Sequence, residues 1–353
     1  KLNHIYKSIA CGVLLAMTAT SCDLDYNPVD TYSDVTEGVN KTDEKPIFNS
    51  VQDVETSMVT LHKKFRDQQE HWYVDKLLIG DAHSDNAYAG TTGAEVVPYE
   101  TNSIEGSNSV LKRDWDRFLG DIAVANRIIV GCDQLKALSE SERGKYQSQA
   151  KIFRAMVMFD MVRLWGNFPV ITTVGGDITE DNVEEMYPTY FPPQNTAEEA
   201  YAQIEKDLTE AVENPNTPTN DTSDKSILTK SVARAMLAKV YAEKPLRDYA
   251  KVIKYADELA ADGFDLVEDF SDLWAYDTEK KDCRVRNTKE AILEAHFPPG
   301  SGNWCTWMFG RNLSNWDESF TWAKWITPSR DLIRLYDCLL YTSDAADEAR
   351  SVD

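Results

Sequence analysis

The chain has few of the residues, and none of the motifs, that mark common catalytic and metal sites. It has only five His, and no two of them have the short spacing of a metal-ligand pair. It contains no HExxH, no GxSxG and no phosphate-binding GxxxxGKS/T sequence. Acidic residues are abundant, but the paired carboxylates of a glycoside hydrolase need a defined separation that abundance does not supply. We therefore predict a protein that is not an enzyme and that has neither a metal site nor a cofactor.

Positive charge is also scarce. Lys and Arg total 37 against 59 Asp and Glu, a formal net charge of −22. A surface that binds nucleic acid needs clustered Lys and Arg to neutralise phosphates, and the sequence has no such cluster, so we expect no nucleic-acid partner. The same acidic balance repels anionic ligands and favours neutral ones such as sugars.

The N-terminus has the pattern of an export signal. Basic Lys1 and Lys7 precede an apolar run at residues 9–19 that is too short to span a bilayer. Residues 19–22 (ATSC) resemble a bacterial lipobox, in which Cys22 would be acylated. Several acyl chains would anchor the protein stably, because each buried methylene contributes about 0.8 kcal/mol. We predict a lipoprotein signal peptide at 1–21 and a lipidated polar tether at 22–46. An ordinary secretion signal with an incidental Cys is the alternative.

The remaining cysteines do not form a framework. The chain has six Cys and no CxxC pair, which excludes a zinc ribbon. Cys132, Cys283 and Cys305 belong to the expected mature domain. A disulfide between Cys283 and Cys305 is compatible with an exported protein, and free thiols remain open as the alternative.

The clearest element is a long helix that begins near Glu140 and ends at Gly166. Ser139 and Glu142 form a capping box, and apolar residues recur at the three-and-four spacing of a buried helix face. Gly166 suits the position after a helix, where positive φ is common. Pro169 then keeps the chain extended.

The other elements indicate a mainly α fold with long irregular loops and a few short strands. A helix–turn–helix at 229–263 resembles a tetratricopeptide unit. We predict that one face of its second helix consists of Tyr249, Val252, Ile253, Ala256 and Leu259. We predict a break at Gly131 and a strand at 291–297. The other predicted helices cover residues 51–66, 109–135 and 196–214.

Aromatic residues are the strongest indication of a binding function. Five of the nine Trp lie between positions 304 and 325, in a segment rich in Gly, Asn and Ser that suits an exposed loop. An aromatic ring offers an apolar face to the C–H side of a sugar, while nearby polar groups bond its hydroxyls. A second patch follows residue 71. The candidate ligand contacts are Trp72, Tyr73, Asp85, Asn86, Tyr88, Trp304, Trp307, Phe309 and Trp316.

Residues 154–170 (RAMVMFDMVRLWGNFPV) resemble the signature helix of the SusD/RagB family of Bacteroidota surface lipoproteins. Further resemblance lies in 123–129 (AVANRII), 287–294 (NTKEAILE), Pro328–Ser329 and Ser84–Ala87, the last near the family's ligand face. The match covers roughly residues 22–337. We interpret Arg163 and Trp165, which mark the family, as structural.

The resemblance implies a SusD-like fold of tetratricopeptide-type helical pairs. It implies a surface-exposed protein, lipid-anchored to the outer membrane through Cys22, that serves nutrient uptake. Asp23 and Asp25 resemble the family's signal for surface export. The implied ligand is an oligosaccharide or polysaccharide, with peptide as an alternative. The implied partner is a SusC-type TonB-dependent transporter, which receives the ligand without bond cleavage.

The C-terminal end differs from the rest of the chain. Residues 338–348 (CLLYTSDAADE) resemble a translated transposase adapter from a sequencing library. We therefore expect natural sequence to stop near Asp337, so that 47–337 is the N-terminal part of a longer SusD-like domain. Residues 338–353 would then be an artefact, and a genuine C-terminus is the alternative.

Two other functions remain open. One is a lipid-anchored glycoside hydrolase, which would release reducing ends from a bound glycan. The other is a helical-repeat scaffold that contacts only proteins, which would show no affinity for small ligands.

Overall fold

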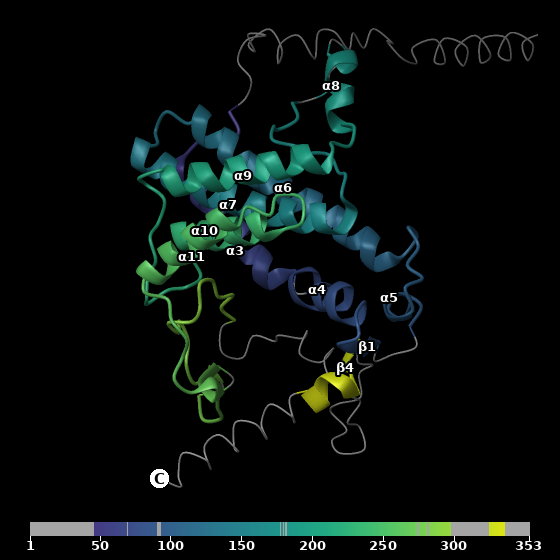
Figure 1. Ribbon diagram of the computed structural model, residues 1–353. Helices are drawn as coiled ribbons and strands as arrows, with labels where there is room; N and C mark the ends of the chain where they lie inside the picture. The colour runs from purple at the N-terminus through teal and green to yellow at the C-terminus, as the bar shows by residue number, and fades with distance from the viewer. Residues whose placement is uncertain are drawn as a thin grey trace, which may run out of the picture. The chain divides into compact units, whose positions relative to one another are not determined.

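The protein is mainly helical, as the sequence predicted. The computed structural model describes residues 46–68, 70–89, 93–176, 178, 180, 182–273, 275–280, 282–297 and 325–335. The chain divides into two compact units, Lys1–Pro46 and Ile47–Asp353, and the described helices and strands all belong to the second. The α-helices are α3 (Val51–Asp67), α4 (Asp75–Leu77), α5 (Val97–Glu100), α6 (Ser109–Gln134), α7 (Glu140–Trp165), α8 (Val183–Tyr190), α9 (Ala197–Glu213), α10 (Lys230–Ala242) and α11 (Tyr249–Ala261) (Figure 1).

The remaining elements are short. Two π-helical turns flank α4, and a 3-10 turn follows α11. The turns are η1 (Glu70–Val74), η2 (Leu78–Ala82) and η3 (Phe270–Leu273). The strands are β1 (Ala87–Ala89), β2 (Tyr276–Asp277), β3 (Asp282–Cys283) and β4 (Ile326–Pro328), and they form two antiparallel pairs, β1 with β4 and β2 with β3.

Helix α7 begins and ends where the sequence predicted. The Ser139 hydroxyl accepts a hydrogen bond from the Glu142 backbone N–H at 3.2 Å, and the Glu142 carboxylate accepts one from the Ser139 N–H at 2.9 Å. Gly166 takes a φ of +71° at the C-cap, which a residue with a Cβ adopts only with strain. The chain then runs extended, and the buried Phe168 forms a bridge with Asn195.

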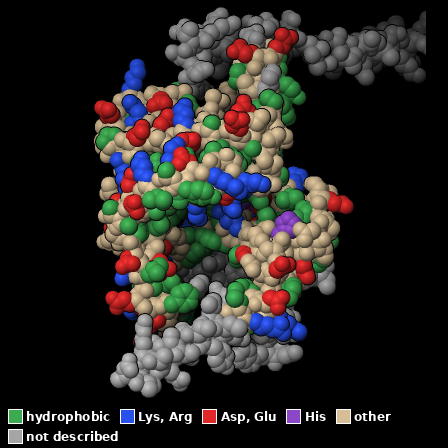
Figure 2. All heavy atoms as spheres, in the orientation of Figure 1, with side chains coloured by type: hydrophobic (Ala, Val, Ile, Leu, Met, Phe, Trp, Pro, Cys, Tyr) green, Lys and Arg blue, Asp and Glu red, His purple; other side chains and the backbone are tan. Residues whose placement is uncertain are grey.

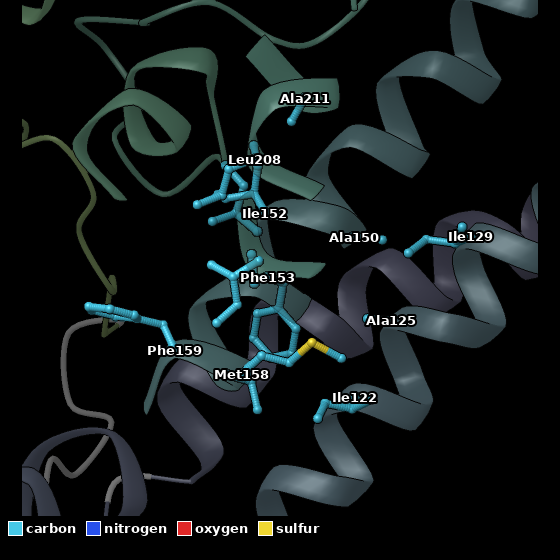
Figure 3. Close-up of a cluster of buried hydrophobic side chains, with 14 of the residues drawn as sticks. Ile122, Ala125, Ile129, Ala150, Ile152, Phe153, Met158, Phe159, Leu208 and Ala211 are labelled. Atoms are coloured by element: carbon cyan, nitrogen blue, oxygen red, sulfur yellow. The ribbon is translucent and has the colours of Figure 1, made fainter. Parts of the chain in front are cut away.

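The core surrounds α7, which packs against α6 on one side and α9 on the other. Figure 3 shows side chains from the three helices meeting in one apolar cluster. Since α7 is buried along most of its length, it is the central element of the fold. The labelled residues are Ile122, Ala125 and Ile129 from α6, Ala150, Ile152, Phe153, Met158 and Phe159 from α7, and Leu208 and Ala211 from α9.

One buried polar network ties these helices together. Arg154 of α7 donates two hydrogen bonds to the Asp207 carboxylate of α9, at 2.8 and 2.7 Å, and one to the Asn126 side-chain oxygen of α6 at 2.7 Å. The Asn126 amide then donates to the carbonyl oxygens of Ile171 and Thr173. The buried charges are therefore paired and hydrogen-bonded, which a core requires. Asn126 and Arg154 lie in two of the stretches that carry the family resemblance.

The structure corrects the predicted break at Gly131. Helix α6 runs through this residue to Gln134. A Cβ on Gly131 would lie 2.4 Å from the Phe48 ring, so glycine is needed there for close packing and not for a turn.

The predicted strand at 291–297 is also wrong. Glu294 donates one backbone hydrogen bond to the Lys225 carbonyl, but the segment pairs with no strand among the described residues. Ile292 and Leu293 pack on the core as an irregular segment instead. Apolar residues in a short run do not distinguish a strand from a buried loop.

Helices α10 and α11 pair as predicted, but the predicted face of α11 is only partly correct, because Val252 packs against the core while other members of that face do not. Tyr249 and Ile253 are exposed, while Tyr255 is buried and stacks on Tyr241 of α10 with ring centroids 6.1 Å apart. Because α11 contacts α10 through a narrow stripe, most of its surface remains open to solvent.

Candidate functional site

An exposed strip at the start of β1, which we call the edge patch, consists of Asp85 and Asn86 just before the strand and Tyr88 within it. Strand β1 pairs with β4, so that Tyr88 lies opposite Thr327 and Ala87 opposite Pro328. The Asn86 carbonyl accepts a hydrogen bond from the Ser329 N–H at 2.8 Å. Asp85 and Asn86 are exposed, and 42% of Tyr88 remains accessible. An aromatic side chain with amide and carboxylate neighbours is suited to bind a polyhydroxylated ligand.

A small apolar cluster supports the edge patch from beneath. Strand alternation points Ala87 inward and Tyr88 outward. Asn108 caps α6, accepts a hydrogen bond from the Tyr99 hydroxyl at 3.3 Å and donates one to the Glu95 carbonyl at 3.0 Å. The loop before α6 is therefore held against the same cluster. Its buried members are Leu78, Ala82, Ala87, Val96, Tyr99, Val110 and Ile326.

Two carboxyl groups, one from α4 and one from α6, are buried together. Asp75 of α4 and Asp114 of α6 hydrogen-bond with each other, and Arg113 donates to Asp75. Burial, reinforced by the nearby Asp114 carboxylate, raises the pKa of Asp75 to about 8. Burial also raises the pKa of Asp114 to about 6. At neutral pH the favoured state has Asp75 protonated, Asp114 ionised and Arg113 charged, so these three groups sum to zero charge.

His71 lies next to these groups. Its Nδ1 is 3.6 Å from a carboxylate oxygen of Asp114, and burial lowers its pKa to about 4, so the ring is neutral at neutral pH. Neither ring nitrogen has a hydrogen-bond partner among the described residues.

The structure separates the predicted aromatic contacts. Trp72 is only 6% exposed and packs in the core against Phe65 and Phe153, so the prediction that it lies on the surface is wrong. Tyr73 is half-buried, with its ring 6.3 Å from that of Phe297. Trp72 and Tyr73 are adjacent in the sequence, and the sequence alone did not show which of the two rings faces the core. Trp304, Trp307, Phe309 and Trp316 lie outside the described residues, as does Cys22.

The far end of the Trp-rich segment meets the edge patch. Trp325 directly precedes β4, is half-buried against the small apolar cluster, and lies 5.9 Å from the guanidinium carbon of Arg113. The β1–β4 pairing therefore brings the end of the first predicted aromatic patch beside the second one, although more than 200 positions separate them in the sequence.

Trp165 packs in the fold, as expected for a structural residue, whereas Arg163 lies on the surface and its structural role stays a prediction. The Trp165 ring packs edge-on against those of Trp115 and Phe118, with centroids 5.2 and 5.7 Å away. Arg163 forms an ion pair with Glu243 at 3.1 Å.

A cleft of about 410 Å³ that the sequence analysis missed lies among α4, η2, α6, α7 and α10. No spacing in the sequence connects its lining residues, because they come from segments that only the fold brings together. Its polar lining residues are His71, Lys76, Asp114, Asp160, Arg163 and Lys239.

The described residues contain neither a cluster of metal ligands nor a membrane-spanning helix. No group of three or more His, Cys, Asp or Glu side chains within these ranges is placed to hold a metal ion. None of the helices in the same ranges is both long and apolar enough to cross a membrane. Cys132 is a buried free thiol and Cys283 an exposed one, while Cys305 lies outside the described residues.

Comparison with known proteins identifies the family. A family model for SusD-like proteins, described as "Starch-binding associating with outer membrane", matches residues 31–242. A SusD-like protein of Bacteroides ovatus is 25% identical over 309 residues, which cover 84% of this chain and 50% of that protein.

Solved structures share the fold. A laminarin-binding SusD-like protein aligns with a TM-score of 0.53 at 20% identity, over 64% of this chain and 48% of its own. Surface glycan-binding protein A from Bacteroides thetaiotaomicron, in complex with laminarihexaose, aligns at 0.55 and 17% identity, over 70% and 49%. The chain thus spans about half the length of the relatives it matches. Because the family model covers more than half of its residues, the chain belongs to the SusD-like family.

Proposed function

We propose that this protein binds an oligosaccharide or polysaccharide at the cell surface and delivers it to a SusC-type TonB-dependent transporter. The edge patch is the observation that carries the proposal, because it presents an exposed Tyr between polar side chains at the end of the Trp-rich segment. The laminarin and laminarihexaose bound by two structural neighbours support a glycan as the ligand. Binding occurs without bond cleavage.

The remaining parts of the chain have roles in the same proposal. Cys22 carries the lipid that anchors the protein in the outer membrane, and residues 22–46 form the tether between the anchor and the domain that begins at residue 47. The outer-membrane association in the family's description supports this arrangement. Further aromatic contacts to the ligand are proposed for Trp304, Trp307, Phe309 and Trp316.

The first experiment measures binding of laminarihexaose, maltohexaose and a mixed peptide library to the full chain by calorimetry. Replacing Tyr88→Ala should weaken binding of the preferred glycan about fivefold to tenfold, since an aromatic contact contributes roughly 0.5–1.5 kcal/mol beyond its buried area. Trp304→Ala and Trp307→Ala should weaken it as well, without loss of helical circular dichroism.

The matched control is Tyr249→Ala, which removes an exposed aromatic from α11 and should leave affinity unchanged. Release of reducing ends from the bound glycan would favour a hydrolase instead. No measurable affinity for any glycan or peptide would favour the protein-binding scaffold.

A further inference from the structure

The cleft among α4, η2, α6, α7 and α10 has the size of a ligand site. Its volume of about 410 Å³ lies within the range of roughly 300–1,000 Å³ that small-molecule pockets occupy. Its walls include Ile79, Met156, Phe159 and Met236. These apolar groups can pack against the C–H face of a sugar ring.

The rim of this cleft is basic, in a chain with a net charge of −22. Lys76, Arg163 and Lys239 line it. Lys76 pairs with Asp160 at 2.6 Å and Arg163 with Glu243, but Lys239 has no ion pair among the described residues. Figure 2 shows Lys and Arg side chains gathered in the middle of this face, between the positions of α10 and α4.

The buried end of the cleft offers hydrogen bonds that the described residues leave unused. His71 is 1% exposed, lines the cleft and has two ring nitrogens without partners there. A neutral imidazole presents one donor and one acceptor, which matches the two roles of a sugar hydroxyl. An unpaired buried polar group destabilises the free protein, so a ligand that pairs it gains binding free energy.

The Asp114 carboxylate does not turn this end of the cleft acidic. It hydrogen-bonds with Asp75, and Arg113 compensates the single negative charge of the pair. The uncompensated charge at the cleft is therefore that of Lys239.

We propose that the cleft binds a carboxylate-bearing sugar, a uronic acid unit, with the carboxylate at Lys239 and a hydroxyl at His71. This inference deepens the proposed glycan-binding function and rests on it.

The cleft and the edge patch can serve one glycan chain. Lys76, Ile79 and Gly80 line the cleft, and Asp85 follows five residues after Gly80. An extended chain of that length spans about 18 Å at most, which is the length of a few sugar units. A uronic acid in the cleft could therefore have its neighbouring units on the edge patch.

The test uses the full chain with three small probes, glucuronate, glucose and acetate, and measures affinity by ligand-observed NMR titration. Glucuronate should bind more tightly than glucose, and its affinity should fall as NaCl is raised. Lys239→Gln should weaken glucuronate binding about fivefold or more, as expected for a hydrogen bond to a charged group. The control variant Lys254→Gln removes a solvent-exposed Lys of α11 that pairs with Glu258, and it should leave the affinity for glucuronate unchanged.

Three outcomes would overturn the proposal. Equal affinity for glucose and glucuronate would show that the carboxylate does not contribute to binding. Equal affinity for acetate and glucuronate would show that the sugar ring does not contribute. An absence of glucuronate binding would mean that the cleft is closed or filled by the chain itself. Because laminarihexaose carries no carboxylate, its binding reports on the proposed function separately, and failure of one probe does not imply failure of the other.

Discussion

At the scale of single residues, the buried charge of Arg154 is stabilised by several partners. Arg154 makes three hydrogen bonds to Asp207 and Asn126, so its charge is paired and each of its three side-chain nitrogens donates a hydrogen bond. Removing one member of such a buried pair typically costs about 3–5 kcal/mol, because the other charge stays buried without a partner. The network also fixes the relative positions of α6, α7 and α9.

Asp75 is buried in its protonated, uncharged form, so we predict that the effect of replacing it on stability depends on pH. Its folded-state pKa of about 8 lies above the ordinary value of 3.8. The stability linked to this shift is therefore present at low pH and is lost as the pH rises through 8. Asp75→Asn resembles the protonated acid, so the melting temperature of the variant relative to wild type should rise between pH 5 and pH 9. The difference in the free energy of unfolding between the variant and wild type should change by at most about 1.4 kcal/mol per pH unit, because a single proton is involved.

The control for this prediction is Asp85→Asn, which removes an exposed carboxylate from the edge patch. Thermal melts of both variants across the pH range give the comparison. A constant difference between Asp75→Asn and wild type would mean that Asp75 is ionised in the folded protein throughout.

At the scale of elements, local signals determined most of the helix boundaries. The capping box at Ser139 predicted the start of α7, and the helices predicted at 51–66 and 196–214 form as α3 and α9. These signals depend on contacts within a few residues of each other. The shape of a helix end is another such signal, and it can be tested directly.

Gly166 ends α7 with a φ of +71° and a ψ of −79°. No atom lies within 4 Å of a Cβ added there, so Gly166→Ala isolates backbone strain from steric overlap. We expect a loss of about 1–3 kcal/mol in the free energy of unfolding, measured by chemical denaturation. Gly120→Ala is the matched control, because it lies inside α6 and also has open space around the added Cβ. It should stabilise the protein by roughly 0.5–1 kcal/mol. Equal effects at the two sites would contradict the strain argument.

Features that depend on distant contacts were not predictable in the same way. The sequence resemblance placed Asp85 and Asn86 near a ligand face, and the aromatic patch added Tyr88. All three are exposed in the structure, but whether they contact a ligand stays a prediction. Trp72, one position from Tyr73, is buried because η1 turns it onto Phe65 and Phe153. The cleft was missed because Lys76, Arg163 and Lys239 come together only through helix packing. Gly131 was misinterpreted as a break because its close neighbour, Phe48, is distant in the sequence.

At the scale of the whole molecule, the acidic balance opposes compactness. The net charge of −22 produces self-repulsion when the chain folds. The basic residues are unevenly distributed, since residues 164–205 contain no Lys or Arg. This segment includes α8, whose Glu184 and Glu185 are exposed. The basic rim of the cleft therefore has the opposite sign of charge to the chain as a whole.

Self-repulsion of this kind weakens when salt screens it, which gives a prediction for the whole chain. Raising NaCl from about 20 to about 200 mM shortens the screening length from roughly 20 Å to below 10 Å. The melting temperature should therefore rise over this range, because repulsion among exposed carboxylates is screened, whereas buried pairs such as Arg154 and Asp207 are screened much less. Replacing Glu184→Gln and Glu185→Gln together should raise the melting temperature in low salt and reduce the rise on adding salt. A melting temperature that falls with NaCl would show that attractive surface pairs outweigh the repulsion of the net charge.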